Sequence, residues 1–145
     1  MDSLLPVIAL VATATLVGIA YRLLRGRGHR VLGRQQIELR RLRPTKNGNL
    51  STELGKQATL LQFSTQYCGR CPSVRRQLAQ LESQHAGISH LEVDITDRIN
   101  VAARFGITQT PTIFLLNAKS ELVYRVGGIP NVLKLNQELE KLGVK

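Results

Sequence analysis

Residues 58–71 read ATLLQFSTQYCGRC, a short apolar run followed closely by two cysteines. The run at 59–63 is typical of a strand that is buried on both faces of a sheet. Beyond the cysteines, apolar residues recur at spacings of four and three from Val74 to Leu81, which predicts a helix from about Cys68 to about Gln84. This part of the chain is therefore expected to run from a buried strand through a cysteine loop into a helix.

The rest of the chain alternates between strand and helix patterns. Strands are expected at 88–95, 112–116 and 122–126, and helices at 99–105 and 131–142. This order combines a parallel half with a hairpin half, and its helices are expected to cover both faces of one small sheet. The predicted fold class is therefore α/β with a central mixed sheet.

An uncharged segment precedes this domain. From Ser3 to Tyr21 the chain has 19 residues without Asp, Glu, Lys or Arg; as a helix they would rise about 28 Å, close to the thickness of a bilayer core. Arg22 then begins a basic stretch, as expected where a span meets the interface. We therefore predict a transmembrane anchor over 1–24. The alternatives are a cleaved signal peptide, which normally carries positive charge before its apolar run, and a buried core helix, which seldom lacks a polar stripe.

The charges that flank the anchor predict its orientation. Arginines follow the span, whereas Asp2 precedes it. This asymmetry favours a single-pass membrane protein whose carboxy-terminal domain is cytoplasmic. An extracytoplasmic domain is the alternative, because long domains can be translocated regardless of flanking charge.

A basic linker is predicted over 25–48, which leaves 49–145 for the domain. The formal net charge of the chain is +10, and residues 1–46 hold nine Lys and Arg against two acidic residues. Anionic lipid headgroups are expected partners of these cations. Nucleic acid is not, because the sequence shows neither a basic face with stacking aromatics nor a nucleic-acid-binding motif. A short strand is expected at 36–39 and a helical turn at 50–55.

The chain has two cysteines, Cys68 and Cys71, in one C-x-x-C motif. Secreted disulfide scaffolds use more cysteines and space them apart. At the start of a helix, free N–H groups and the helix dipole would stabilise the Cys68 thiolate, which would attack a disulfide, and Cys71 would resolve the product. Half of a zinc site is one alternative, although His29, His85 and His90 are not spaced to complete it. A redox-inactive pair is the other, and neither a metal nor a cofactor is expected.

Four features together resemble the thioredoxin family over about residues 58–142. They are LLQF at 60–63, CGRC at 68–71, Thr110-Pro111 before TIFLL, and Gly127-Gly128 after the predicted hairpin. The resemblance implies a thioredoxin-like fold and a protein-disulfide oxidoreductase that needs no cofactor. It also implies a cis Thr110–Pro111 bond beside the cysteines, with the Thr110 backbone pairing with an extended substrate segment. From the residues alone, a trans proline at the start of an edge strand is the alternative.

The chain departs from the family pattern at four positions. Tyr67 stands where Trp is common, Arg70 where Pro is common, Gln62 where an Asp is often buried, and Glu92 where Lys is frequent. Arg70 should favour the thiolate and so make the couple more oxidising, unless it is simply a solvated surface charge. Glu92 is expected to shuttle the proton of Cys71; the alternative is a surface residue on an alternating strand.

These expectations combine into a membrane-tethered thiol–disulfide oxidoreductase that acts on protein disulfides or thiols. A thioredoxin-reductase-like donor or a membrane electron donor is its expected redox partner. The direction of electron flow depends on the potential of the couple relative to its compartment. The alternative of a different class is a membrane-tethered binding module that uses the groove of the fold without redox turnover.

Overall fold

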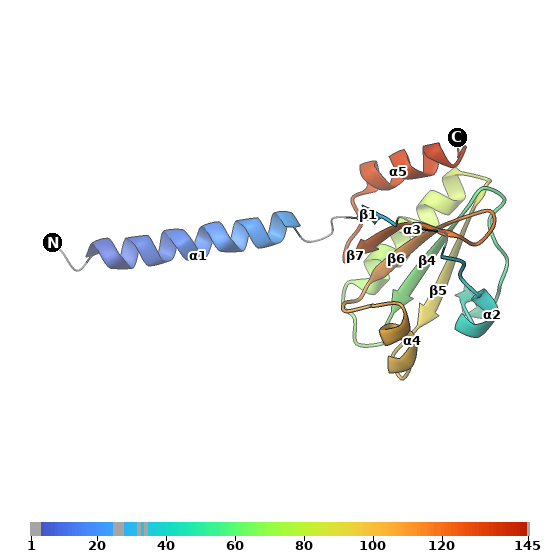
Figure 1. The fold of residues 1–145 in the computed structure, drawn as a ribbon, viewed down its shortest axis with the longest axis horizontal. Coiled ribbons are helices and arrows are strands. Elements are labelled where there is room, and N and C mark those ends of the chain that lie inside the picture. The colour runs from blue at the N-terminus through green and yellow to red at the C-terminus, as the bar shows by residue number, and fades with distance from the viewer. Residues whose placement is uncertain (1–3, 25–27, 32, 34, 145) are drawn as a thin grey trace.

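The computed structural model describes residues 4–24, 28–31, 33 and 35–144. It consists of a long helix, α1 (Leu4–Leu24), and a domain in which helices surround a sheet (Figure 1). Asp2, Arg25, Arg27 and Arg34, which entered the charge patterns above, lie outside the described residues.

The described residues form a seven-stranded mixed sheet in the order β1-β7-β6-β4-β5-β2-β3. Its central strands β4 and β5 are parallel, and β6 and β7 form the antiparallel hairpin half, as predicted. The strands are β1 (His29–Arg30), β2 (Thr45–Lys46), β3 (Asn49–Leu50), β4 (Ala58–Ser64), β5 (Ile88–Asp94), β6 (Thr112–Asn117) and β7 (Leu122–Gly127).

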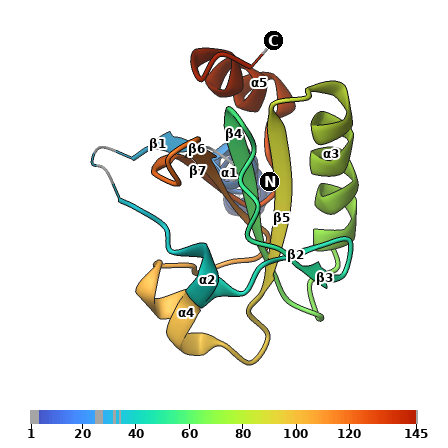
Figure 2. The ribbon, with the colours of Figure 1, turned by 90° about the vertical axis from the view of Figure 1, so that its right-hand side faces the viewer.

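Helices cover both faces of this sheet, which also confirms the prediction. Figure 2 shows the sheet between α3 (Cys71–Gln84) on one side and α2 (Leu39–Leu42) with α4 (Ile99–Arg104) on the other. The terminal helix α5 (Val132–Lys141) packs on the α3 face through Leu135 and Leu139. Successive side chains of β4 point to opposite faces of the sheet. Leu60 therefore packs in the core under α3, and Leu61 packs in the core under α2 and α4.

The segment before β4 differs from the predicted linker. Strand β1 pairs with β7, and β2 pairs with β5. Ile37 and Leu42 are buried, each only 2% exposed. These contacts join residues far apart in the sequence, so residue spacing could not reveal them. From Gly28 onward, the described residues of this segment belong to the folded domain rather than to a solvated spacer.

Two short elements predicted in this segment take other forms. In place of the strand at 36–39 there is a single bridge, Gln36↔Glu121, followed by α2. In place of the helical turn at 50–55, the chain runs irregularly after β3. Its hydrogen bonds go to both backbone and side chains: Ser51 N–H donates to the Pro44 carbonyl at 3.0 Å, and Gly55 N–H donates to Thr59 Oγ1 at 2.9 Å. A short segment without its own periodicity takes the conformation that such tertiary contacts permit.

Helix α1 is not buried against the described domain, although Tyr21 and Arg22 near its end lie beside it. The apolar window Leu4–Arg22 has a mean hydropathy of 2.2, and none of it is buried. A buried core helix is therefore the wrong interpretation of this segment. By length and composition α1 could be a membrane span or a signal sequence.

Candidate active site around the cysteine pair

The two cysteines lie where β4 gives way to α3. Cys71 is the first residue of α3, and Cys68 belongs to the preceding turn, so the helix begins three residues later than predicted. Their sulfurs are joined in a disulfide, and their Cα atoms are 5.4 Å apart. Cys71 is 2% exposed, whereas Cys68 is half-buried. Cys68 is therefore the sulfur that a second molecule can reach.

Pro111 lies at the same end of the sheet. The Thr110–Pro111 peptide bond is cis, so the trans alternative is wrong. The carbonyl oxygen of Pro111 accepts a hydrogen bond from Gly128 N–H at 2.7 Å, and Thr112 pairs with Gly127. This pairing holds the loop before β6 against the end of β7.

A surface cleft of about 880 Å³ opens beside Cys68. Its walls come from the cysteine loop, the loop before Pro111 and the end of β7. The lining residues are Tyr21, Arg22, Tyr67, Cys68, Gly69, Arg70, Gln109, Thr110, Gly127, Gly128 and Ile129. Sequence reasoning had linked Cys68, Arg70 and Thr110 to disulfide exchange, but it had assigned Tyr21 and Arg22 only to the end of the predicted anchor and the basic stretch after it.

Gln62 connects the start of α3 to the sheet beneath it. Its side chain is fully buried, and its Nε2 donates to the carbonyl oxygen of Cys71 at 3.2 Å. Its Oε1 lies 3.3 Å from Nε2 of His90. Burial lowers the pKa of His90 below its ordinary value of 6.5, so the imidazole is held neutral. The position that often carries an Asp in thioredoxins thus holds an uncharged hydrogen-bonding group here.

Glu92 stands beside Gln62 in the register of β4 and β5. Its Oε1 accepts from Ser64 Oγ at 2.6 Å and from the Arg75 guanidinium at 2.6 Å. The hydrogen bond to Glu92 raises the pKa of Arg75, and burial of the guanidinium opposes this. Arg75 lies one helical turn after Cys71, so the Glu92 carboxylate is tied to the first turns of α3.

Sequence reasoning missed Arg75 and the role of His90. The alternation predicted for 88–95 already places residues 90 and 92 on one face of the sheet. The spacing from Cys71 to Arg75 likewise places both on one side of α3. The pairing of Glu92 with Arg75 depends on how α3 packs against β5. The sequence pattern does not contain this information.

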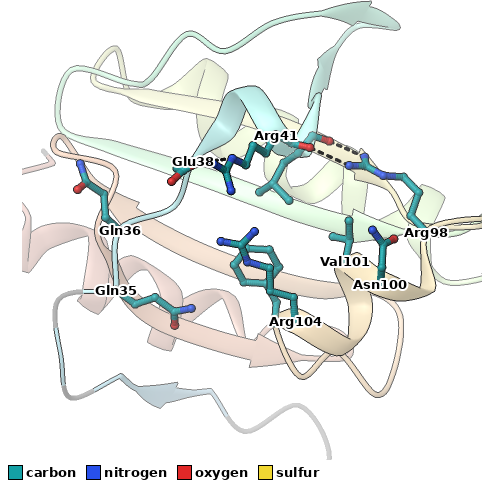
Figure 3. A pocket seen from close by; sticks show the side chains of 10 residues that line it. Gln35, Gln36, Glu38, Arg41, Arg98, Asn100, Val101 and Arg104 are labelled. Carbon is teal, nitrogen blue, oxygen red and sulfur yellow. Dashed lines mark hydrogen bonds and ion pairs between the residues drawn. The ribbon is translucent and has the colours of Figure 1, made fainter.

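A second cavity, of about 250 Å³, lies on the opposite face of the sheet, between α2 and α4 (Figure 3). Arg98 donates to the backbone carbonyls of Leu42 at 2.5 Å and Arg41 at 3.0 Å. Arg41 also pairs with Glu38 at 2.6 Å. These bonds fasten α2 to the start of α4, so Arg98 is accounted for by its structural role.

The fold and the cis-proline cleft define a class of protein, and comparison with known proteins gives the family. A sequence model of the thioredoxin family matches residues 42–141, well over half of the chain. The chain therefore belongs to the thioredoxin family.

Individual thioredoxins are similar at low identity. Thioredoxin from Chlorobaculum thiosulfatiphilum is 27% identical over 100 residues, which are 66% of this chain and 91% of that protein. Thioredoxin C-3 from Corynebacterium nephridii is 27% identical over 82 residues, and the match spans only 56% of that protein and 57% of this chain. The short form of spinach chloroplast thioredoxin f superposes with a TM-score of 0.52 at 25% identity, over 61% of this chain and 78% of that one.

Family membership, the fold and the bonded pair Cys68–Cys71 support a thiol–disulfide oxidoreductase. Proteins with thiols or disulfides are the substrate class that the family suggests. Within the described residues, no three His, Cys, Asp or Glu side chains are grouped as the ligands of a metal ion would be.

Proposed function

We propose that this chain exchanges disulfides with other proteins through Cys68 and Cys71, on a domain that α1 tethers to a membrane. The observation that carries the proposal is the unequal exposure of the pair: Cys68 opens into the cleft beside cis-Pro111, while Cys71 is buried behind it. One sulfur is accessible to substrate and the other is protected, as sequential attack requires.

The exchange proceeds in two steps. In the reductive direction, the Cys68 thiolate attacks one sulfur of a substrate disulfide and releases the other as a thiolate. Cys71, deprotonated, then attacks Cys68, which forms the Cys68–Cys71 disulfide and releases the first substrate sulfur. Two electrons pass to the substrate, whose two thiolates take up protons. Oxidation of substrate thiols is the same sequence in reverse.

Local structure supports Cys68 as the first nucleophile. Cys68 lies in the turn that leads into α3, a helix of 14 residues that begins at Cys71, and helix N-termini favour a negative charge. Arg70 is exposed and lines the same cleft, so its cation adds to this field. Beside the sulfur, the backbone of Thr110 borders the cleft where an extended substrate segment would pair with it.

Glu92 is proposed to receive the proton of Cys71 during resolution. Glu92 lies beside Gln62, whose side chain donates to the Cys71 carbonyl. The Glu92 carboxylate pairs with Arg75, which belongs to α3 as Cys71 does. Glu92→Gln should slow resolution of the mixed disulfide at neutral pH. The rate is measured by quenching the reaction with acid at set times and separating the mixed disulfide from the products. Glu82→Gln is the matched control, because Glu82 pairs with Lys46 near the far end of α3. Equal rates in the two variants would remove Glu92 from proton transfer.

The tether is proposed to be a single membrane span that leaves the catalytic domain in the cytoplasm. The support is the length and apolarity of α1 together with the arginines that follow it. A thioredoxin-reductase-like donor or a membrane electron donor would then return electrons to the pair. A carboxy-terminal reporter that is active on only one side of the membrane tests the orientation.

Dithiothreitol-driven reduction of insulin tests the function. Wild type in detergent should accelerate insulin precipitation, and Cys68→Ser should abolish the acceleration because the accessible nucleophile is lost. Cys71→Ser should instead trap a mixed disulfide between Cys68 and insulin, visible on a non-reducing gel. Equal precipitation by wild type and Cys68→Ser would favour a tethered binding module without redox turnover.

A further inference from the structure

We propose that the active-site end of the domain is held against the surface of the bilayer, so that its substrates are disulfides or thiols in juxtamembrane segments of membrane proteins. This inference rests on the proposed function and specifies its substrate class. Three features of the molecule carry it: the length of the tether, the point where the tether joins the sheet, and the side chains around the cleft.

The tether is short. Helix α1 ends at Leu24, and Gly28 already lies against the domain, where a side chain on it would collide with the ring of Tyr124. Only residues 25–27 stand between these points. Four Cα–Cα steps span at most about 14 Å. The domain therefore remains within about that distance of the end of the span, whatever path these residues follow.

The tether joins the sheet at a fixed point. Strand β1 is antiparallel to β7, with His29 opposite Arg125 and Arg30 opposite Tyr124. Arg30 also bonds Glu138 of α5 at 3.0 Å. Backbone pairing and this ion pair together hold the first described residues of the domain to the edge of the sheet. The short connection between Leu24 and Gly28 therefore limits how far the whole domain can move from the end of α1.

The point of attachment lies at the active-site end of the sheet. Because β1 runs antiparallel to β7, with His29 opposite Arg125, Gly28 lies on the side of His29 toward Gly127, the end of β7. Gly127 pairs with Thr112, and Gly128 N–H bonds the carbonyl of Pro111, next to the cleft over Cys68. Figure 1 shows α1 leaving the domain at the end of the sheet where β7 finishes. The turn around Ala118 is at the opposite end.

The side chains around the cleft suit a headgroup layer. Tyr67 is 85% exposed and Ile129 is 44% exposed, and both line the cleft together with Arg70. Tyr21 and Arg22, from the last turns of α1, line the same cleft. Aromatic and apolar side chains next to cations are the combination found at membrane interfaces, where the cations meet lipid phosphates.

This placement selects substrates by position. A cysteine pair just outside the bilayer reaches Cys68 by lateral diffusion in the membrane, where both partners are confined to a thin layer. A large soluble protein must instead enter the space between the domain and the lipid. The disulfide exchange itself is the one described above, with the same balance of electrons and protons.

A tryptophan reporter tests the placement without using activity. The chain contains no Trp, so Tyr67→Trp introduces a single fluorophore at the cleft, and Ala118→Trp places one at the opposite end of the sheet. Both full-length variants would be reconstituted in vesicles of phosphatidylcholine and phosphatidylglycerol with brominated acyl chains. We expect at least twofold stronger quenching at position 67 than at position 118. Equal quenching at the two positions would overturn the inference.

A longer tether tests the consequence for substrates. A twelve-residue Gly/Ser insertion after residue 26 adds an average reach of about 20 Å. In vesicles, each protein is given insulin and a transmembrane peptide with a juxtamembrane disulfide, and the ratio of the peptide rate to the insulin rate is measured. This ratio should be about tenfold higher for wild type than for the insertion variant. Identical substrate ratios in the two proteins would overturn the inference even if both are active. Loss of insulin reduction by detergent-solubilised wild type would overturn the proposed function instead, while tryptophan quenching would still decide the placement.

Discussion

The two faces of the sheet are built differently, although the same strands supply both. On the face covered by α2 and α4, the rings of Phe63, Phe105 and Phe114 pack at centroid distances of 4.8 to 6.1 Å. On the face covered by α3, the end nearest the cysteines carries Gln62 and His90 in a hydrogen-bonded pair. The first face is built around the aromatic cluster, and the buried hydroxyls of Thr59 and Thr112 on it bond to nearby backbone groups. The second face carries a side-chain amide and an imidazole in its core.

This difference separates stability from chemistry. Burial of apolar surface is the main favourable contribution to folding, and the aromatic cluster concentrates it away from the cysteines. Buried polar groups contribute little net free energy but cost much when a partner is removed. Changes on the α4 face should therefore lower stability with little effect on the site, and changes on the α3 face should affect both.

Phe114→Ala should have the largest effect on stability. The ring is 1% exposed and contacts both other rings of the cluster, so its loss should cost about 3–5 kcal/mol in the free energy of unfolding. Urea denaturation measures this loss, and insulin reduction by the fraction that remains folded should be close to wild type. Leu133→Ala, at a side chain that is 75% exposed, is the control and should shift stability by about 0.5 kcal/mol or less. A small loss in Phe114→Ala would remove the assigned role of the cluster.

Gln62→Leu should have a smaller effect on stability and a larger one on the site. The substitution keeps most of the volume but removes the hydrogen bonds to the Cys71 carbonyl and to His90, which should cost about 1–3 kcal/mol. The rate of disulfide exchange should also fall, because the start of α3 loses its connection to the sheet. Gln80→Leu, at an exposed position of the same helix, is the control. An unchanged exchange rate in Gln62→Leu would show that α3 holds its position without this bond.

His90 should make stability depend on pH. Burial lowers its pKa, while Glu82 and Glu92 oppose that shift and Arg75 and Lys46 assist it. The unfolded chain therefore binds a proton near the ordinary value of 6.5, where the folded protein does not. The stability that this difference in proton binding contributes is present above the ordinary pKa of 6.5 and is lost as the pH falls through the lower pKa of the folded state. Wild type should lose stability relative to His90→Gln as the pH drops from about 7 to about 5. Parallel curves for the two proteins would contradict a neutral buried His90.

Glu138→Gln should have the smallest effect on global stability. The ion pair with Arg30 is more than half exposed on the arginine side, so its loss should cost less than about 1 kcal/mol. Hydrogen exchange at β1 should nevertheless become faster, because this pair holds the tether side of the sheet to α5. The exposed Glu140→Gln is the control. Unchanged exchange at β1 would mean that backbone pairing with β7 is sufficient.

Much of the fold followed from local pattern. The buried run at 59–63, the periodicity from Val74 to Leu81 and the alternation at 88–95 each predicted an element that the structure contains. These patterns can be read from the sequence because side chains on one face of a helix or strand recur at a fixed interval along the chain. The start of α3 was misplaced because the Cys68 turn is itself compact, with Cys71 N–H bonding the Cys68 carbonyl at 3.2 Å.

The candidate site divides in the same way. Cys68, Cys71, Thr110 and Pro111 could be proposed from motifs. The network behind them could not, because Arg75 meets Glu92 only through the packing of α3 on β5. Nor could the pairing of β1 with β7 and of β2 with β5.

By itself, the sequence determined the order of strands and helices from β4 to α5, the cysteine motif and the presence of one long apolar helix, because each depends on residues that are neighbours along the chain. The tertiary structure alone decided that Cys68 is the exposed sulfur, that Gln62 and His90 support the start of α3, and that the tether meets the sheet at its active-site end. These features depend on which distant segments pair and in which register. One step of register moves a side chain to the other face of the sheet, so local sequence pattern cannot specify them.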